Sequence, residues 1–156
     1  MLYLVSYEAN EGALGVVLNR PSGKTVAELL TVPGLGLLGQ IPVFFGGPVS
    51  RDRLSFAVFE WERESKSVAC RLNLELNEAK ALAAEGEGTV WAFVGYAGWT
   101  GGQLERELEE KAWLVQKPGR EMLDPELCKT MWRNFMRSHG PWFRLLADAP
   151  DDPSLN

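Results

Sequence analysis

Histidine and cysteine, the residues most often found in metal centres and nucleophile–base pairs, are scarce in this sequence. Its 156 residues include one histidine, His139, and two cysteines, Cys70 and Cys128. A zinc site usually takes four ligands, and a Ser or Cys nucleophile normally needs a neighbouring base, so these residues supply neither. The G-x-S-x-G and H-E-x-x-H motifs are absent as well. We therefore expect no metal ion, no cofactor and no catalytic residue.

Long apolar runs, a basic leader and an excess of positive charge are also absent. The longest uncharged stretch, 29–49, is broken by prolines and glycines and lacks the roughly 20 apolar residues of a membrane span. The apolar segment 1–7 has no basic residue before it, unlike a signal peptide. A net charge of −5 opposes binding to a phosphate backbone without a local basic face. We expect a cytoplasmic protein that does not enter the membrane, and nucleic acid is disfavoured as its partner.

What is present is enough core material for one domain. The hydrophobic fraction is 46%, with six tryptophans and seven phenylalanines among the large side chains. Cys70 and Cys128 each lie within an apolar pattern, which predicts reduced, buried thiols rather than a disulfide. We expect a single domain over 1–148, followed by a polar, proline-containing tail at 149–156.

The hydrophobic pattern alternates between strand-like and helix-like segments. Runs rich in β-branched and aromatic residues predict strands at 2–7, 13–18, 42–45, 54–61, 68–72 and 89–96, and a further strand at 113–115 is left open. The near-continuous apolar run 89–96 predicts a central strand that is covered on both faces. The segment 19–24, Asn-Arg-Pro-Ser-Gly-Lys, predicts a loop.

Capping residues and helical spacing predict four helices. Thr25 caps a short one, Asn77 caps one that runs through Ala84, and a third follows the turn 97–102. In the third helix we expect Glu107 to pair with Lys111 on the solvent side. Pro125 opens a last long helix that 140–141, Gly-Pro, terminates. The whole predicts an α+β fold.

Three glycine-containing segments each follow a predicted strand: 19–21, 46–48 and 95–102. If these strands are neighbours, the segments meet at one edge of the sheet, where a crevice could hold a small anion or nucleotide. In the alternative interpretation, glycines permit tight turns and close packing, and the polar side chains tie loops together. The candidate ligand-binding residues are Asn19, Arg20, Gly47, Gly98, Trp99, Gln103 and Glu105.

The last predicted helix carries the one locally basic region of this acidic chain. Lys129, Arg133 and Arg137 lie four residues apart, opposite an apolar arc. This face is the candidate for binding nucleic acid or an acidic partner. A solvated helix face whose late cations favour the helix dipole explains the pattern equally well.

Several motifs, in order along the chain, closely resemble the YqgE/AlgH family. They are 11–21 (EGALGVVLNRP), 45–49 (FGGPV), 93–99 (FVGYAGW), 102–105 (GQLE), Trp113 and 152–156 (DPSLN). The resemblance implies a largely antiparallel mixed sheet, split and curled towards a pseudo-barrel, with flanking helices. It implies a bacterial protein without established catalytic residues, for which a role as a transcriptional regulator has been suggested. The candidate ligand-binding residues match the signature positions of the family.

The chain departs from the family pattern in two places. Gly101 stands where members usually have a proline, which predicts a looser loop. Members also usually begin earlier, with a strand ahead of the one that matches 2–7, so we expect that strand to be absent here. A missing strand would expose a sheet edge, and self-association is therefore expected. From the residues and the resemblance together, we expect a regulatory or binding protein that contacts a protein partner or a small anionic ligand. One alternative is an enzyme or nucleotide-binding protein that uses the glycine-loop crevice, with Arg20 holding an anion and Glu105 as the nearest acid or base. The other is direct binding of nucleic acid through the last helix.

Overall fold

The computed structural model describes residues 1–148, apart from the side chains of 128 and 129. The tail expected at 149–156 lies outside the described residues. Within them the strands are β1 (Leu2–Glu8), β2 (Gly12–Val17), β3 (Pro21–Thr25), β4 (Pro42–Phe45), β5 (Val49–Glu62), β6 (Ser67–Leu72) and β7 (Thr89–Thr100). The helices are α1 (Val26–Leu29), α2 (Leu76–Glu85), α3 (Gln103–Glu109), α4 (Cys128–Ser138) and α5 (Pro141–Asp148). Short 3₁₀ helices are η1 (Gly36–Gln40), η2 (Arg120–Leu123) and η3 (Pro125–Leu127).

Strand β7 is the centre of a seven-stranded mixed sheet. It pairs antiparallel with β2 and β5 and parallel with β4, while β1 and β3 lie at the two ends of the order β1-β2-β7-β4-β3. Strand β6 extends the sheet from β5. Only one of these six pairings is parallel, which confirms the predicted α+β fold with a largely antiparallel sheet.

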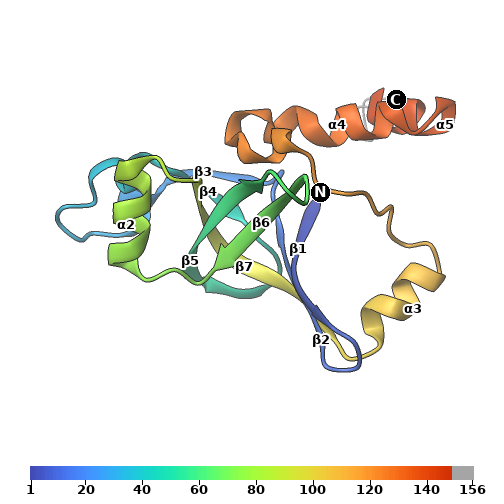
Figure 1. Ribbon diagram of the computed structural model, residues 1–156, viewed down its shortest axis with the longest axis horizontal. Coiled ribbons are helices and arrows are strands. Elements are labelled where there is room, and N and C mark those ends of the chain that lie inside the picture. The colour runs from blue at the N-terminus through green and yellow to red at the C-terminus, as the bar shows by residue number, and fades with distance from the viewer. Residues whose placement is uncertain (149–156) are drawn as a thin grey trace.

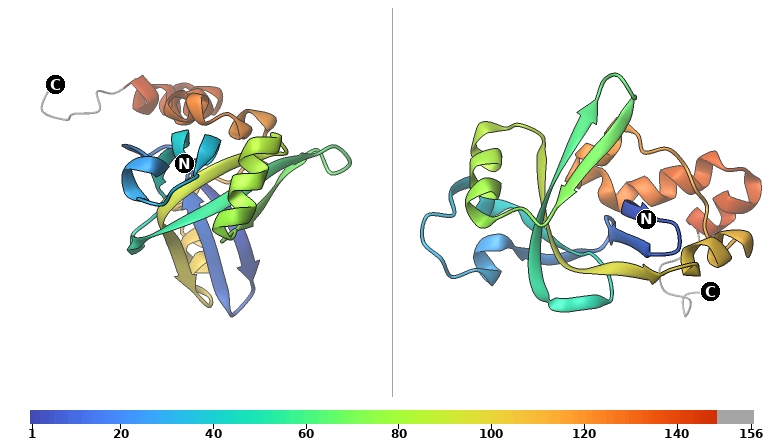
Figure 2. Two further views of the ribbon diagram at one scale, coloured as in Figure 1. Left: turned by 90° about the vertical axis from the view of Figure 1, so that its left-hand side faces the viewer. Right: turned by 60° about the horizontal axis from the view of Figure 1, so that its bottom comes forward.

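The sheet curls so that β1 approaches β6 (Figures 1 and 2). The hydroxyl of Tyr3 donates a hydrogen bond to the carbonyl of Val68 across this junction, at 2.6 Å. No backbone ladder joins β1 to β6 among residues 1–148, so the curl stops short of a closed barrel. This is the split, pseudo-barrel form that the family resemblance implies.

The core lies on both faces of β7. Inside the curl, Trp91 and Phe93 stack with nearly parallel rings, 5.8 Å between centroids, and Phe44 and Phe59 pack against them. On the other face, valines of β4, β5 and β7 pack beneath α1, η1 and α2. Burying one such side chain contributes about 1.5–3 kcal/mol. The prediction of a central strand covered on both faces is confirmed.

The chain ahead of β4 differs from the prediction in one element. The segment predicted as a loop forms β3, because Pro21 lies opposite Phe44 and Thr25 lies opposite Pro42. The ladder is irregular between these two pairs, so the polar, glycine-containing sequence fits an edge strand. Helix α1 begins after Thr25 as predicted, and the Glu28 carboxylate accepts the Thr25 N–H at 2.7 Å.

After β6, several elements of the structure differ from those predicted. Helix α2 has Glu75 rather than Asn77 at its N-cap position. Strand β7 continues to Thr100 because its last residues pair with β2, so the turn before α3 is shorter than predicted. The segment 113–115 is not a strand. The last helical region holds two helices, since α4 ends at Ser138 and Pro141 opens α5.

Helices α4 and α5 form a layer across one end of the curled sheet, joined to α3 by an extended segment (Figure 1). Met122 of η2 and Met131 of α4 are buried against the aromatic core. None of the helices in the described part of the chain combines the length and the apolar character needed to cross a bilayer.

Candidate functional site

The glycine pair Gly46–Gly47 packs directly on the backbone of β7. A Cβ atom on Gly47 would overlap the carbonyl group of Tyr96, and one on Gly46 would overlap the carbonyl oxygen of Gly95. This close approach lets Gly46 accept the N–H of Val17 at 2.8 Å from β2. The pair therefore joins β2, β4 and β7, and residues with side chains would not fit.

Asn19 and Arg20 lie next to this junction. The Arg20 carbonyl accepts the N–H of Phe45 at 2.8 Å, and the Asn19 side chain accepts a hydrogen bond from the amino group of Met1. Asn19 is half-buried, whereas the Arg20 side chain is exposed. The guanidinium of Arg51 lies over the Phe45 ring, 5.5 Å from its centroid. The structure thus brings together Arg20, Gly47 and an aromatic ring that the sequence did not single out.

A second group gathers around Glu107 of α3. Its carboxylate accepts hydrogen bonds from the indole of Trp113 at 2.7 Å, the indole of Trp99 at 2.9 Å and the amide of Gln103 at 2.9 Å. These three bonds, led by that from Trp113, lower the pKa of Glu107 below its ordinary value. The expected partner of Glu107, Lys111, is not its contact. We call these four residues the Glu107 cluster.

The remaining candidates lie beside this cluster. Glu105 accepts a hydrogen bond from the hydroxyl of Tyr7 at 2.8 Å, and this bond raises the pKa of Tyr7. Gly98 is exposed and lies opposite Leu14 in the ladder between β2 and β7. Gly101 contacts the turn between β1 and β2 so closely that a Cβ atom would overlap Asn10. These contacts fix the tip of the β1–β2 hairpin to α3.

The candidate ligand-binding residues therefore form two groups that follow one another along β7. Arg20 is level with Phe45, which lies beside Val94 of β7. Glu105 comes after Thr100, the last residue of β7. Six strand residues separate these levels, which corresponds to roughly 20 Å. Arg20 and Glu105 thus lie near different ends of this part of β7, and ligand binding at either group stays a prediction.

The basic face expected on the last helix is partly neutralised. Arg137 donates to the carboxylate of Asp148, with its Nε at 3.0 Å, and the Nε of Arg144 donates to the carbonyl of Arg137 at 3.2 Å. Arg133 is half-buried, and the side chain of Lys129 lies outside the described residues. An ion-paired guanidinium attracts a phosphate less strongly than a free one. Binding of nucleic acid here stays a prediction.

The exposed apolar face of α5 was not predicted from the sequence. Trp142 and Leu145 are each 69% exposed and Leu146 is 45% exposed. Arg137 of α4 and Asp148 of α5 form an ion pair that holds the two helices together. The proline at 141, taken as a stop signal, is also the residue type favoured at the first position of a helix, and the apolar residues that follow could have revealed α5.

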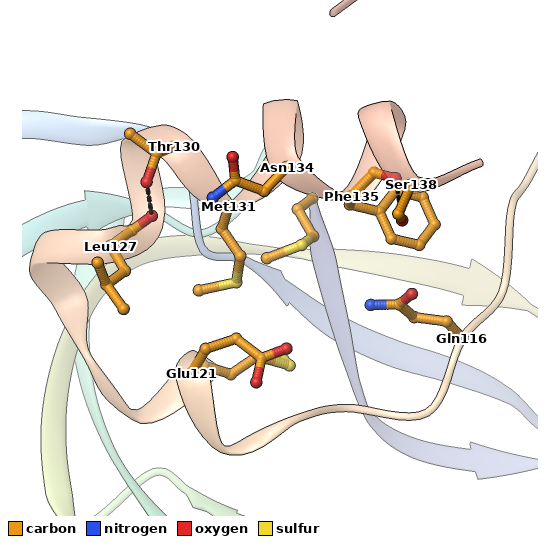
Figure 3. Close-up of a pocket in the computed structure, with 10 residues that line it drawn as sticks. Gln116, Glu121, Leu127, Thr130, Met131, Asn134, Phe135 and Ser138 are labelled. Atoms are coloured by element: carbon orange, nitrogen blue, oxygen red, sulfur yellow. Dashed lines mark hydrogen bonds between the residues drawn. The ribbon is translucent and has the colours of Figure 1, made fainter. Parts of the chain in front are cut away.

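A cavity of about 300 Å³ lies beneath α4, between it and η2 (Figure 3). Met122, Met131 and Phe135 give it apolar walls, and Gln116 and Glu121 stand on the side facing α4. The hydroxyls of the two α4 residues that line it donate to helix carbonyls, so they are already satisfied. Its lining mixes methionine and polar side chains, a composition suited to adaptable packing.

The described residues supply little reactive chemistry. They hold no group of three or more His, Cys, Asp or Glu that could bind a metal ion. Burial raises the pKa of the Cys70 thiol to about 12, so it stays protonated and weakly nucleophilic at neutral pH. The Nδ1 of His139 lies 2.8 Å from the carbonyl of Phe135, within its own helix. The side chain of Cys128 lies outside the described part.

Comparisons with known proteins identify the family. The AlgH-like family model (DUF179) matches residues 1–144. A UPF0301 protein of Streptomyces avermitilis is 37% identical over 94% of this chain and 80% of its own length, and one of Chlorobium phaeobacteroides is 30% identical over 98% and 84%.

Two solved structures are similar in fold. The AlgH protein of Pseudomonas aeruginosa has a TM-score of 0.62 and 28% identity, covering 97% of this chain and 85% of its own. A protein of Corynebacterium diphtheriae has a TM-score of 0.66 and 18% identity, covering 95% and 81%. The motifs, the curled sheet and these full-length matches agree: the chain belongs to the AlgH-like (YqgE/AlgH, UPF0301) family.

Proposed function

We propose that this protein is a non-enzymatic binding protein with a regulatory role, and that it docks a protein partner through the exposed face of α5. The observation that carries the proposal is the exposure of Trp142, Leu145 and Leu146 side by side on one short helix. Exposed large apolar side chains that cluster commonly mark protein interaction surfaces. Tryptophan is also among the residues that contribute most at protein interfaces.

The way α5 is held supports this role. Two contacts hold α5 against α4. The Arg137–Asp148 ion pair lies at the C-terminal end of α5, and the hydrogen bond from Arg144 to the Arg137 carbonyl lies at its middle. Ala147 on the inner side of α5 is buried, so the helix presents its other side outward. A helix held in place loses little conformational freedom when a partner binds, which favours affinity.

The regulatory part of the proposal rests on family membership and on the absence of reactive groups in the sequence. The alternative, nucleic-acid binding through α4, is less favoured because Arg137 already has a carboxylate partner and the whole chain carries a net charge of −5.

The test compares three purified proteins as baits in extracts of the source cells. Leu145→Glu places a charge on the α5 face, and Leu37→Glu is the matched control, because Leu37 is also a large exposed leucine (55%) but lies on η1, beside α2. We expect a partner that the parent and Leu37→Glu capture in equal amounts and that Leu145→Glu loses. Equal capture by all three proteins would reject docking through α5.

A further inference from the structure

A second surface, distinct from α5, is built where β3 meets β4. These strands pair antiparallel with Pro21 opposite Phe44, and the N–H of Phe45 donates to the Arg20 carbonyl at 2.8 Å. Arg20 is therefore the neighbour of Phe45 across the pair. Directly opposed residues of an antiparallel pair project from the same face of the sheet. The register of the pair thus places Arg20 and Phe45 on the same face of the sheet.

A third side chain completes this surface. Arg51, at the start of β5, lies with its guanidinium carbon 5.5 Å from the centroid of the Phe45 ring. Phe45, the last residue of β4, is 37% exposed, which is unusual for a phenylalanine in a sheet. One guanidinium therefore lies over an accessible aromatic ring, and Arg20 is the neighbour of the same residue across the strand pair. We call Arg20, Phe45 and Arg51 the arginine–phenylalanine surface.

Neither cation of this surface is neutralised within residues 1–148. Arg71 and Arg137 each form an ion pair with a carboxylate, but no carboxylate pairs with Arg20 or Arg51, although Asp52 follows Arg51 directly in the chain. Two unpaired guanidiniums in a protein with net charge −5 create a local positive potential. An anion that bridges them would gain charge-assisted hydrogen bonds.

The backbone beneath the surface is rigid. Immediately after Phe45, the N–H of Gly46 donates to Val94 at 2.9 Å, and the Gly46 carbonyl accepts from Val17. Gly47 then contacts the backbone of β7 with no space for a side chain. The backbone of Phe45 and Arg20 is thus held by three strands before any ligand arrives, so only side chains remain to be ordered when a ligand binds.

We propose that the arginine–phenylalanine surface binds a nucleotide unit, with the phosphate between Arg20 and Arg51 and the base against Phe45. A planar guanidinium recognises phosphate oxygens in pairs, and every nucleobase offers a face that stacks on an aromatic ring or on arginine. An acidic peptide would satisfy the charges but leave the ring without a partner. The nucleotide unit is either free or part of a single strand.

The experiment titrates the full chain by calorimetry at low ionic strength. The probes are AMP, adenosine, inorganic phosphate and a single-stranded oligoadenylate. We expect AMP to bind more tightly than adenosine or phosphate, because only AMP uses both the charges and the ring. Tighter binding of the oligoadenylate than of AMP would assign the surface to single strands, and the reverse would assign it to free nucleotides. Both results support the proposal.

Variants decide whether binding occurs at this surface. Arg20→Ala and Arg51→Ala should each weaken AMP binding about tenfold or more, and Phe45→Leu should weaken it roughly fivefold or more. Arg63→Ala, which removes an exposed cation from the β5–β6 turn, is the charge-matched control and should bind as the parent does. The proposal is overturned if neither AMP nor oligoadenylate binds, if phosphate binds as tightly as AMP, or if Arg20→Ala and Arg63→Ala behave alike.

Discussion

At the scale of single residues, two of the candidate glycines differ in what surrounds them. Gly47 lies against the carbonyl group of Tyr96, whereas Gly98 is exposed, and a Cβ atom there would come within 3.3 Å of the Tyr96 ring only. Neither glycine has a positive φ, so a substitution at either position tests the room for a side chain and not backbone strain. Gly47 therefore has a structural reason to be glycine that does not depend on any ligand.

We expect Gly47→Ala to lower the free energy of unfolding by about 1–3 kcal/mol or more, because an added methyl group must push β4 away from β7. Gly98→Ala should cost less than about 1 kcal/mol, since the flexible ring of Tyr96 can shift. Urea denaturation followed by circular dichroism gives both values. Similar values for the two variants would show that the close approach at Gly47 carries no special cost.

Residue types alone predicted some of this site and not the rest. Arg20 and Gly47 follow strands that the hydrophobic pattern located, so their neighbourhood was predictable. The roles of Trp99 and Glu107 were not, because an indole that donates to a carboxylate eight residues away depends on how α3 folds back on β7. Helical spacing suggested Lys111 as the partner of Glu107, but two indoles and an amide take its carboxylate oxygens.

At the scale of elements, the Glu107 cluster attaches α3 and the chain after it to β7. Trp99 belongs to β7, Gln103 and Glu107 to α3, and Trp113 to the segment beyond α3. The two indole rings meet edge to face at 5.8 Å. One carboxylate is thus the common acceptor of three segments.

Glu107→Gln should lower the melting temperature at neutral pH, because a neutral amide is a weaker acceptor and its NH₂ group faces three donors. The folded-state pKa of Glu107 lies below its ordinary value of 4.5. Its stabilising effect is therefore complete above about pH 4.5 and is lost as the pH falls through the lower folded-state pKa. The difference between parent and variant, measured by thermal melts at neutral pH and about pH 3, should shrink in acid. A difference that stays constant would argue against this role.

Elements whose two ends are marked by proline or glycine were predicted well. Elements that contain glycines, or that begin directly after a Gly-Pro pair, were not. Strand β4 was placed correctly because its four residues begin at Pro42 and end directly before the glycine pair. Strand β7 was cut short because Gly98, Gly101 and Gly102 suggested a turn over 97–102, although pairing with β2 extends the strand to Thr100. Helix α5 was missed because Gly-Pro ends one helix and begins the next. The end of β7 depends on its pairing with β2, which is distant in the sequence and cannot be read from residue types.

At the scale of the whole molecule, β1 is an edge strand. It pairs with β2 alone among the described strands, and Tyr3 makes a single hydrogen bond towards β6. Leu4 and Tyr7 on this strand are 41% and 46% exposed. An unpaired edge that carries apolar side chains is a template for pairing with another chain.

We therefore expect concentration-dependent self-association, measurable by sedimentation velocity. Ser6→Lys adds a charge to the exposed β1 strand and should shift the protein towards monomer. Thr31→Lys, at an exposed position after α1, is the control for the added charge and should associate as the parent does. A parent that remains monomeric at high concentration would contradict this expectation.

The central position of β7 also sets the order in which the newly made chain can fold. Strands β2, β4 and β5 all need β7 as a neighbour, yet β7 is synthesised after them. While only residues 1–88 have been synthesised, β7 is missing, so the earlier strands have no shared neighbour against which to bury their apolar side chains. Nascent chains halted before Thr89 should thus be cut rapidly by protease, and chains with Thr100 outside the exit tunnel should be protected. We expect the α4–α5 layer to be added afterwards to a sheet that has already formed.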